Sequence, residues 1–221
     1  MLGKVGAGCI RSILKFVPWA IAAIALVACG ATYSELQRVR ARFGEVTAHK
    51  FRDHSDVREF MIRAAIAEAQ QPIVVIGDSI TEMAPFSRQI CGHTVVNAGV
   101  GGMTIREAKR LVGPVLDERG AFLVVLTVGA NDAASPRARE DFAALIEATK
   151  PLSARPLVAA TASPNAQTNR EIGAAAAAAG VHFVDPELPP GSKMADGIHY
   201  TARGYSAWLP AIEAAIAKEC E

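Results

Sequence analysis

The sequence predicts an α/β protein of three layers, in which helices cover both faces of a doubly wound, mainly five-stranded parallel sheet. Two observations support this fold class. Short apolar runs that suit buried strands alternate with longer helical stretches, an order typical of parallel sheets with helical crossovers. Hydrophobic residues make up 51% of the 221 residues and aromatic residues only 6%, so the core must consist mainly of Ala, Val, Ile and Leu. Such side chains suit helices packed on a parallel sheet.

The predicted elements follow one another in regular alternation. Apolar runs predict strands at residues 73–76, 94–97, 122–128, 157–161 and 181–184. The stretches between and after them predict helices at residues 81–88, 104–119, 135–150, 166–179 and 201–218. Pro136 near the start of one helix and Gly180 after the end of another occupy positions that these residue types prefer.

Residues 1–34 are expected to form a signal peptide or a membrane anchor. The first 15 residues carry only positive charges, and residues 16–34 carry none. The run Leu26-Val27-Ala28-Cys29 (26–29) resembles the lipobox of bacterial lipoproteins, in which the cysteine becomes the lipidated first residue of the mature chain. An uncleaved signal anchor and a buried helix of the domain are the alternatives. The lipoprotein and the anchor both predict an exported, membrane-associated protein, in a bacterial periplasm or cell envelope.

Residues 35–71 are expected to form a polar helical stalk and a lead-in helix, which precede a single domain at residues 72–221. The lead-in helix is predicted to start near Ser55, which suits a helix cap, and to end before Pro72. A chain of 221 residues is long enough for one domain with a substantial core and short for two.

Charge and motif content exclude several classes of function. The chain has 23 Lys and Arg against 22 Asp and Glu, with no basic block, so nucleic acid is not expected as a partner. No His and Cys cluster has zinc spacing, so no metal is implied. The glycine loop at residues 97–102 lacks the third glycine of a dinucleotide-binding motif, and no Walker sequence occurs. No cofactor is therefore expected.

Four short motifs carry the chemical signal, at residues 77–80, 97–102, 129–132 and 196–199. Taken singly, each is an ordinary turn, glycine loop or helix cap. The first three follow successive predicted strands, and the carboxyl edge of an open α/β sheet is where such folds place their ligand site. We therefore expect these motifs to converge in one crevice.

The residue types in these motifs point to acyl transfer. A serine hydroxyl becomes a nucleophile when an imidazole removes its proton and a carboxylate orients that imidazole. Ser79 is predicted to lie where a buried strand turns into a helix, and Asp196 and His199 are three residues apart on one loop. The other histidines lack a carboxylate three residues before them. We therefore predict Ser79, His199 and Asp196 as nucleophile, base and orienting carboxylate.

The four motifs together resemble the SGNH hydrolases, the superfamily that includes GDSL-type esterases and lipases, over residues 73–209. The resemblance implies a flavodoxin-like sheet and a serine nucleophile at Ser79, with Asp196 and His199 completing the triad. It assigns the oxyanion hole to the N–H groups of Ser79 and Gly102 and to the side chain of Asn131. The departure from the pattern is Ile80, where leucine is commoner, and this changes packing rather than chemistry.

These features predict a serine esterase that hydrolyses carboxylic esters, acyl or acetyl, through an acyl-enzyme. The expected substrates are small-molecule, lipid or acylated-carbohydrate esters. The loops that would set specificity are short, which favours an open site for small acyl groups such as acetyl. Two alternatives remain: an acyltransferase or acetyltransferase acting on a carbohydrate hydroxyl, and a catalytically inert, membrane-tethered binding module.

Cys91 and Cys220 are predicted to form a disulfide. Cys9 and Cys29 belong to the targeting segment, so the exported domain has two cysteines, and export places them where thiols oxidise. The helices after Ser79 and after His199 are expected to cover the same face of the sheet and to run to its far end, where both cysteines would meet. The alternative is a buried Cys91 with a free Cys220 at a frayed terminus.

Overall fold

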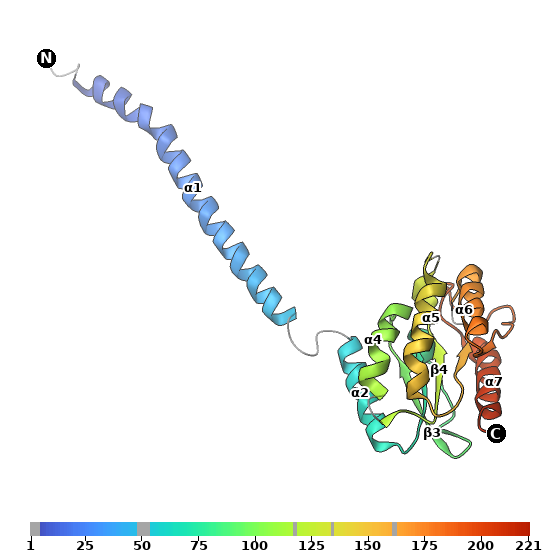
Figure 1. The fold of residues 1–221 in the computed structure, drawn as a ribbon. Helices are drawn as coiled ribbons and strands as arrows, with labels where there is room; N and C mark the ends of the chain where they lie inside the picture. Colours follow the sequence, from blue (N-terminus) through green and yellow to red (C-terminus); the bar gives the residue numbers. More distant parts are fainter. Residues whose placement is uncertain (1–4, 48–53, 117–118, 134, 161–162) are drawn as a thin grey trace. The chain divides into compact units, whose positions relative to one another are not determined.

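The computed structural model describes residues 5–47, 54–116, 119–133, 135–160 and 163–221, which fall into two compact units, Met1–Arg52 and Asp53–Glu221 (Figure 1). The first unit contains the helix α1 (Val5–Thr47). Its segment Val17–Arg40 has exposed side chains and a mean hydropathy of 1.6, and by length and composition it could cross a membrane. This helix is compatible with a signal peptide or an anchor.

The second unit is built on one sheet with the strand order β2-β3-β1-β4-β5-β6. The strands are β1 (Ile73–Gly77), β2 (Gln89–Ile90), β3 (His93–Gly99), β4 (Leu123–Thr127), β5 (Val158–Ala160) and β6 (His182–Val184). All neighbouring pairs are parallel except β2 with β3. Because the chain starts in the middle of the sheet and winds outward in both directions, the predicted doubly wound fold is confirmed.

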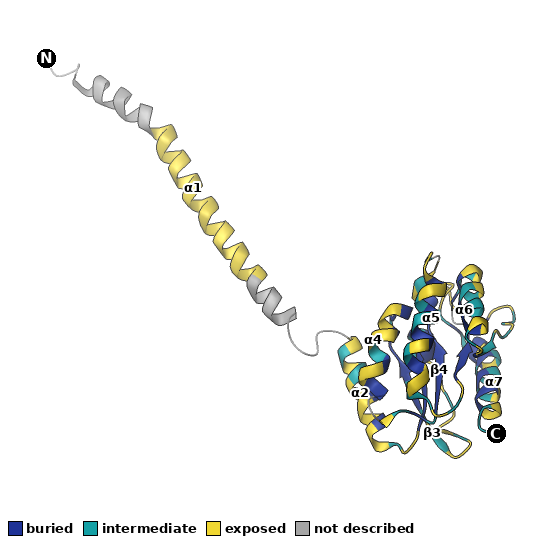
Figure 2. Ribbon diagram, in the orientation of Figure 1, coloured by how far each residue is buried: buried dark blue, intermediate teal, exposed yellow. Residues whose placement is uncertain are grey.

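Helices form the outer two layers. They are α2 (His54–Glu68), α3 (Ser79–Glu82), α4 (Ile105–Leu116), α5 (Ala138–Thr149), α6 (Ala166–Ala178) and α7 (Ala202–Lys218), with short 3₁₀ turns η2 (Ala130–Asp132) and η3 (Lys150–Leu152). Alternate residues of β1 show the layering: Val74 and Ile76 pack with α2, α4, α5 and α6, whereas Ile73 and Val75 pack with α7. The sheet is accordingly buried between helices whose outer faces are exposed (Figure 2).

The helix predicted at residues 81–88 is wrong in extent. The structure has only one turn, α3, whose C-cap is Met83. Pro85 explains the difference, because proline disfavours helical backbone in the residue before it and lacks an N–H to continue a helix. The chain then enters β2, a sixth strand that the sequence pattern did not indicate.

Cys91 and Gly92 form the turn that joins β2 to β3. Both have positive φ, 53° and 81°, which is the backbone of a tight two-residue hairpin. The predicted disulfide is confirmed: Cys91 is bonded to Cys220, with Cα atoms 6.4 Å apart. Ile80 and α7 do pack on the same face of the sheet, as expected. The route to Cys91, however, runs through an irregular segment and β2 rather than along a helix.

Candidate active site

The four sequence motifs meet at the carboxyl edge of the sheet. β1 ends at Gly77, directly before Asp78 and Ser79, and it pairs in register with Gly99 of β3 and Thr127 of β4. The motif at residues 129–132 follows β4, and the motif at 196–199 leads into α7. Because β1, β3 and β4 are parallel, the motifs that follow them lie together at the carboxyl edge of the sheet.

Ser79, His199 and Asp196 form a continuous hydrogen-bonded series. The Ser79 Oγ lies 2.9 Å from His199 Nε2, and His199 Nδ1 lies 2.7 Å from Asp196 Oδ2. Ser79 is the first residue of α3, which holds its hydroxyl at the end of a buried strand. In this arrangement the imidazole can accept the serine proton while the carboxylate fixes its orientation.

Asp196 remains ionised under ordinary conditions. Its pKa is lowered to about 2, first by the hydrogen bond from the His199 side chain and then by the backbone N–H groups of Ile198 and His199. Those two N–H groups reach Asp196 Oδ1 at 2.9 and 3.0 Å. Oδ1 therefore binds the backbone of its own loop, and Oδ2 remains available to accept from the imidazole.

Asp78 connects the Ser79 turn to the neighbouring 129–132 turn. Its Oδ1 accepts the Ile80 N–H at 3.0 Å, and its Oδ2 accepts the N–H groups of Gly129 and Ala130 at 3.2 and 2.9 Å. Burial raises its carboxyl pKa to about 6, against the lowering effect of these hydrogen bonds. Asp78 is not among the residues predicted for the site, although an Asp directly before a helix start is a strong N-cap signal.

Asn131 lies beside the glycine loop. Its Nδ2 donates to the backbone O of Met103 at 3.0 Å, which is the residue after Gly102. The amide carries a second hydrogen that this bond does not use. Gly102 itself has φ of 79° and is exposed, a conformation that a residue with a side chain adopts at a cost.

The helix α2 contributes to the site, although its residues were predicted to lie outside the domain. Arg58 donates to the backbone O of Gly99 through Nε at 3.0 Å and Nη2 at 2.8 Å, and Nη2 also reaches the O of Asn97 at 3.2 Å. His54, which was assigned to the extension, lies 2.6 Å from Glu82. An arginine is common on the polar face of a helix, so the local sequence does not predict its contact with the glycine loop.

Two other histidines have structural contacts. His182 Nδ1 lies 3.3 Å from Glu219 Oε1, and His93 Nδ1 lies 2.7 Å from the backbone O of Gln71. Neither contact involves the four motifs. Across the residues whose placement is described, no group of three or more His, Cys, Asp or Glu side chains could hold a metal ion.

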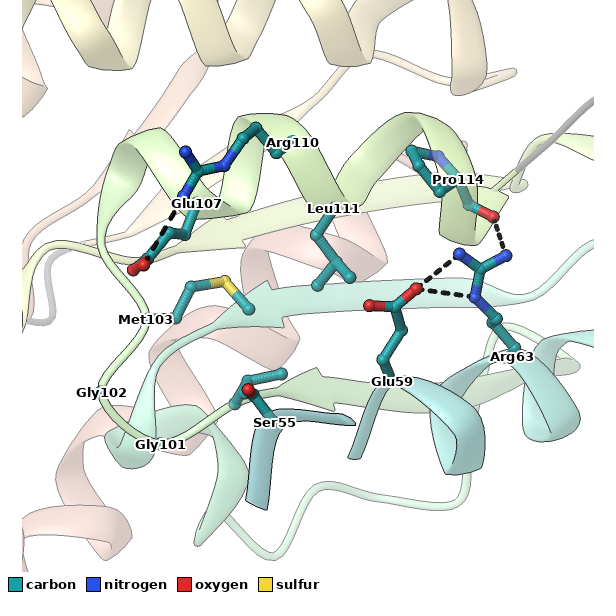
Figure 3. A pocket seen from close by; sticks show the side chains of 11 residues that line it. Ser55, Glu59, Arg63, Gly101, Gly102, Met103, Glu107, Arg110, Leu111 and Pro114 are labelled. Atoms are coloured by element: carbon teal, nitrogen blue, oxygen red, sulfur yellow. Dashed lines mark hydrogen bonds and ion pairs between the residues drawn. The ribbon is translucent and has the colours of Figure 1, made fainter. Parts of the chain in front are cut away.

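A cavity of about 360 Å³ lies between α2 and α4, bounded at one side by the glycine loop (Figure 3). Met103 and Leu111 point into it. Charged pairs border it: Arg63 with Glu59, and Arg110 with Glu107. The cavity shares Gly101 and Gly102 with the candidate site but is not lined by Ser79 or His199, so it lies behind the glycine loop rather than at the serine.

Comparison with known proteins gives a family match. Residues 75–207, more than half of the chain, match the GDSL-like Lipase/Acylhydrolase family. No curated protein matches the sequence.

Solved structures share the fold at low sequence identity. A GDSL-like lipase from Bacteroides thetaiotaomicron is 20% identical with a TM-score of 0.59, over 75% of this chain and 99% of that one. A lipase/acylhydrolase from Enterococcus faecalis is 22% identical with a TM-score of 0.52, over 67% and 96% of the chains. A variant of an acetyl xylan esterase from Geobacillus stearothermophilus is 18% identical with a TM-score of 0.52, over 67% and 95%.

The family match covers the first three motifs and the Asp196 to His199 loop, and the shared fold puts these motifs at one edge of the sheet. This chain belongs to the GDSL-like lipase/acylhydrolase family.

Proposed function

We propose that this protein is a serine esterase that hydrolyses carboxylic esters, acyl or acetyl, through an acyl-enzyme. The observation that carries the proposal is the hydrogen-bonded series from Ser79 through His199 to Asp196, with distances of 2.9 and 2.7 Å. Membership of an acylhydrolase family supports ester bonds as the target.

In the proposed acylation step, the Ser79 Oγ attacks the ester carbonyl carbon while His199 Nε2 takes the hydroxyl proton. The carbonyl oxygen becomes an oxyanion, for which the N–H groups of Ser79 and Gly102 and the Asn131 amide are the proposed donors. The intermediate then collapses: the bond to the alcohol oxygen breaks, and that oxygen takes the proton from His199.

Deacylation repeats the sequence with water. His199 removes a proton from the water, the resulting hydroxide adds to the acyl carbon, and the same donors hold the second oxyanion. The bond to Ser79 Oγ then breaks, the serine recovers its proton from His199, and the acid leaves. Asp196 carries its negative charge through both steps, because its pKa of about 2 lies far below neutral pH.

The proposed substrates are small-molecule, lipid or acylated-carbohydrate esters with small acyl groups such as acetyl. An accessible site supports this, because the Asp196 side chain is 45% exposed and that of His199 30%. The apolar segment in α1 supports an exported protein tethered to a membrane, either as a lipoprotein through Cys29 or by an uncleaved anchor.

The test is hydrolysis of p-nitrophenyl esters of increasing chain length by the wild type and by Ser79→Ala. The wild type is expected to hydrolyse the acetyl ester fastest and to react with a fluorophosphonate probe. The Ser79→Ala variant is expected to fold normally, to show no hydrolysis above background and to resist the probe. Retention of most of the wild-type rate in Ser79→Ala would contradict the proposal.

A further inference from the structure

Glu82 joins the helix that starts at Ser79 to the loop that contains Gly102. It is the last residue of α3, and its Oε2 accepts the N–H of Gly101 at 2.7 Å. Resting on the proposed function, we propose that Glu82 is a positioning residue for ester hydrolysis, which sets the place of the Gly102 N–H relative to Ser79.

The Glu82 carboxylate is itself held from α2. Its Oε1 lies 2.6 Å from His54 Nε2 and 3.3 Å from Arg58 Nε. The side chains of Glu82 and Arg58 are only 19% and 16% exposed, so this ion pair is largely shielded from water. With one oxygen engaged by α2, the other is directed at the Gly101 N–H, and the carboxylate has little freedom to move.

Beyond the Arg58 contact with Gly99, the segment from Val100 to Met103 is attached to neighbouring elements at three points. Before the loop turns, the Val100 N–H donates to the Gly77 O at 2.9 Å. At its far end, the Met103 O accepts from Asn131 at 3.0 Å. Glu82 provides the attachment between them, at Gly101. The turn is also closed by the hydrogen bond from the Met103 N–H to the Val100 O at 3.1 Å. Its two central residues are glycines, the residue type with the greatest backbone freedom, so the Glu82 contact restricts the part of the turn that is most free to move.

The backbone at the end of β3 packs closely against α3, so Glu82 starts near the glycine loop. A Cβ on Gly99 would collide with the backbone of Glu82, so the end of β3 lies directly against α3. Asn97 reinforces the contact by donating through Nδ2 to the Thr81 O at 2.7 Å. The nucleophile helix and the start of the loop are therefore one rigid block, and Glu82 extends that rigidity to the residue before Gly102.

An oxyanion donor contributes only when it is aimed in advance at the charge that develops in the transition state. A loosened Gly102 N–H should therefore lower kcat and leave KM nearly unchanged, because the lost interaction is made in the transition state. Losing one donor outright costs about 10²- to 10³-fold in kcat. We expect Glu82→Ala to lower kcat by about 10- to 100-fold, because the Gly102 N–H remains present but is less well placed.

The experiment measures kcat and KM for p-nitrophenyl acetate with the full chain in detergent. Glu82→Ala and Glu82→Asp are both expected to lose kcat, since neither side chain reaches Gly101. Glu82→Gln is expected to keep more of kcat than either of these variants, because its carbonyl oxygen has the same reach to the Gly101 N–H, although its NH2 group cannot accept from Arg58. Glu213→Ala is the matched control: it also deletes a carboxylate that accepts a backbone N–H, that of Ser87 at 2.8 Å, and should leave kcat unchanged.

Wild-type kcat in folded Glu82→Ala or Glu82→Asp would overturn the proposal, as would a Glu82→Gln variant as slow as Glu82→Ala. If Glu82→Ala fails to fold, the test is the comparison of kcat between Glu82→Asp and Glu82→Gln: equal values would overturn the proposal. Equal hydrolysis by the wild type and Ser79→Ala would instead refute the proposed function, so the two failures are distinguishable.

Discussion

Removal of the Cys91–Cys220 disulfide is expected to lower the free energy of unfolding by about 2 to 5 kcal/mol and to leave ester hydrolysis unchanged. The bridge spans a sequence separation of 129 residues. For a loop of that length, the chain-entropy model gives about 5 kcal/mol at 25 °C, which is the upper end of what native disulfides usually contribute. Activity should persist because Cys91 precedes β3, at the opposite end of the sheet from Ser79.

The assay is urea unfolding of three samples: the oxidised wild type, the wild type reduced with dithiothreitol, and the double variant Cys91→Ser, Cys220→Ser. The reduced wild type and the double variant should unfold at the same urea concentration, below that of the oxidised protein. Arg155 Nη2 donates to the backbone O of Cys220 at 2.8 Å. The change to Ser leaves that carbonyl group in place, so the double variant can keep this hydrogen bond. The difference therefore reports the covalent bond rather than the attachment of the C-terminus.

Two results would refute this reasoning. An unchanged unfolding midpoint in the double variant would mean that the bridge does not restrict the unfolded chain. A folded double variant without ester hydrolysis would mean that the bridge acts on the site itself, contrary to its position at the far end of the sheet.

Three further predictions concern the site and the N-terminus. Asn131→Ala should lower kcat by about 10²- to 10³-fold, whereas a change confined to KM would make Asn131 a ground-state binder. Burial raises the pKa of Asp78 from 3.8 to about 6, so the folded protein holds the carboxyl proton more tightly than the unfolded chain does. As pH rises from about 4 to 6, the free energy of unfolding should therefore fall by about 3 kcal/mol through this group. Urea unfolding across that pH range should show this fall in the free energy of unfolding for the wild type but not for Asp78→Asn. The same pH dependence in both proteins would contradict the prediction. Cys29→Ser should leave a heavier, unlipidated precursor in the membrane fraction, and identical masses for both proteins would favour an uncleaved anchor.

The strands were predictable because buried parallel strands are short apolar runs bounded by polar turns. The apolar run before Ser79 predicts a strand at residues 73–76, and β1 is Ile73–Gly77. The helix after Ser79 is shorter than its composition predicts, because Pro85 prevents its continuation. The small strand β2 has no apolar pattern and forms because the Cys91 and Gly92 turn folds it back on β3, so pairing rather than composition creates it.

The proposed catalytic groups were predictable because their spacing is local: Asp196 and His199 lie on one loop, and their hydrogen bond depends little on the rest of the chain. The supporting contacts were not. Glu82 meets Gly101 across 19 residues, and Arg58 meets Gly99 across 41. Contacts of this kind depend on how elements pack in three dimensions, and a charged residue on a helix gives the same local pattern whether it faces water or a partner.

The packing of α2 determines where a truncated protein should begin. The family match starts at residue 75, and the sequence pattern placed the domain boundary at 72. Ile62 and Ile66 of α2 are nevertheless 1% and 4% exposed, within the core beneath β1 and β3. A chain cut at residue 72 would uncover that apolar surface and lose Arg58 from the glycine loop. A soluble version for crystallisation or enzymology should therefore retain the whole helix from His54 onward.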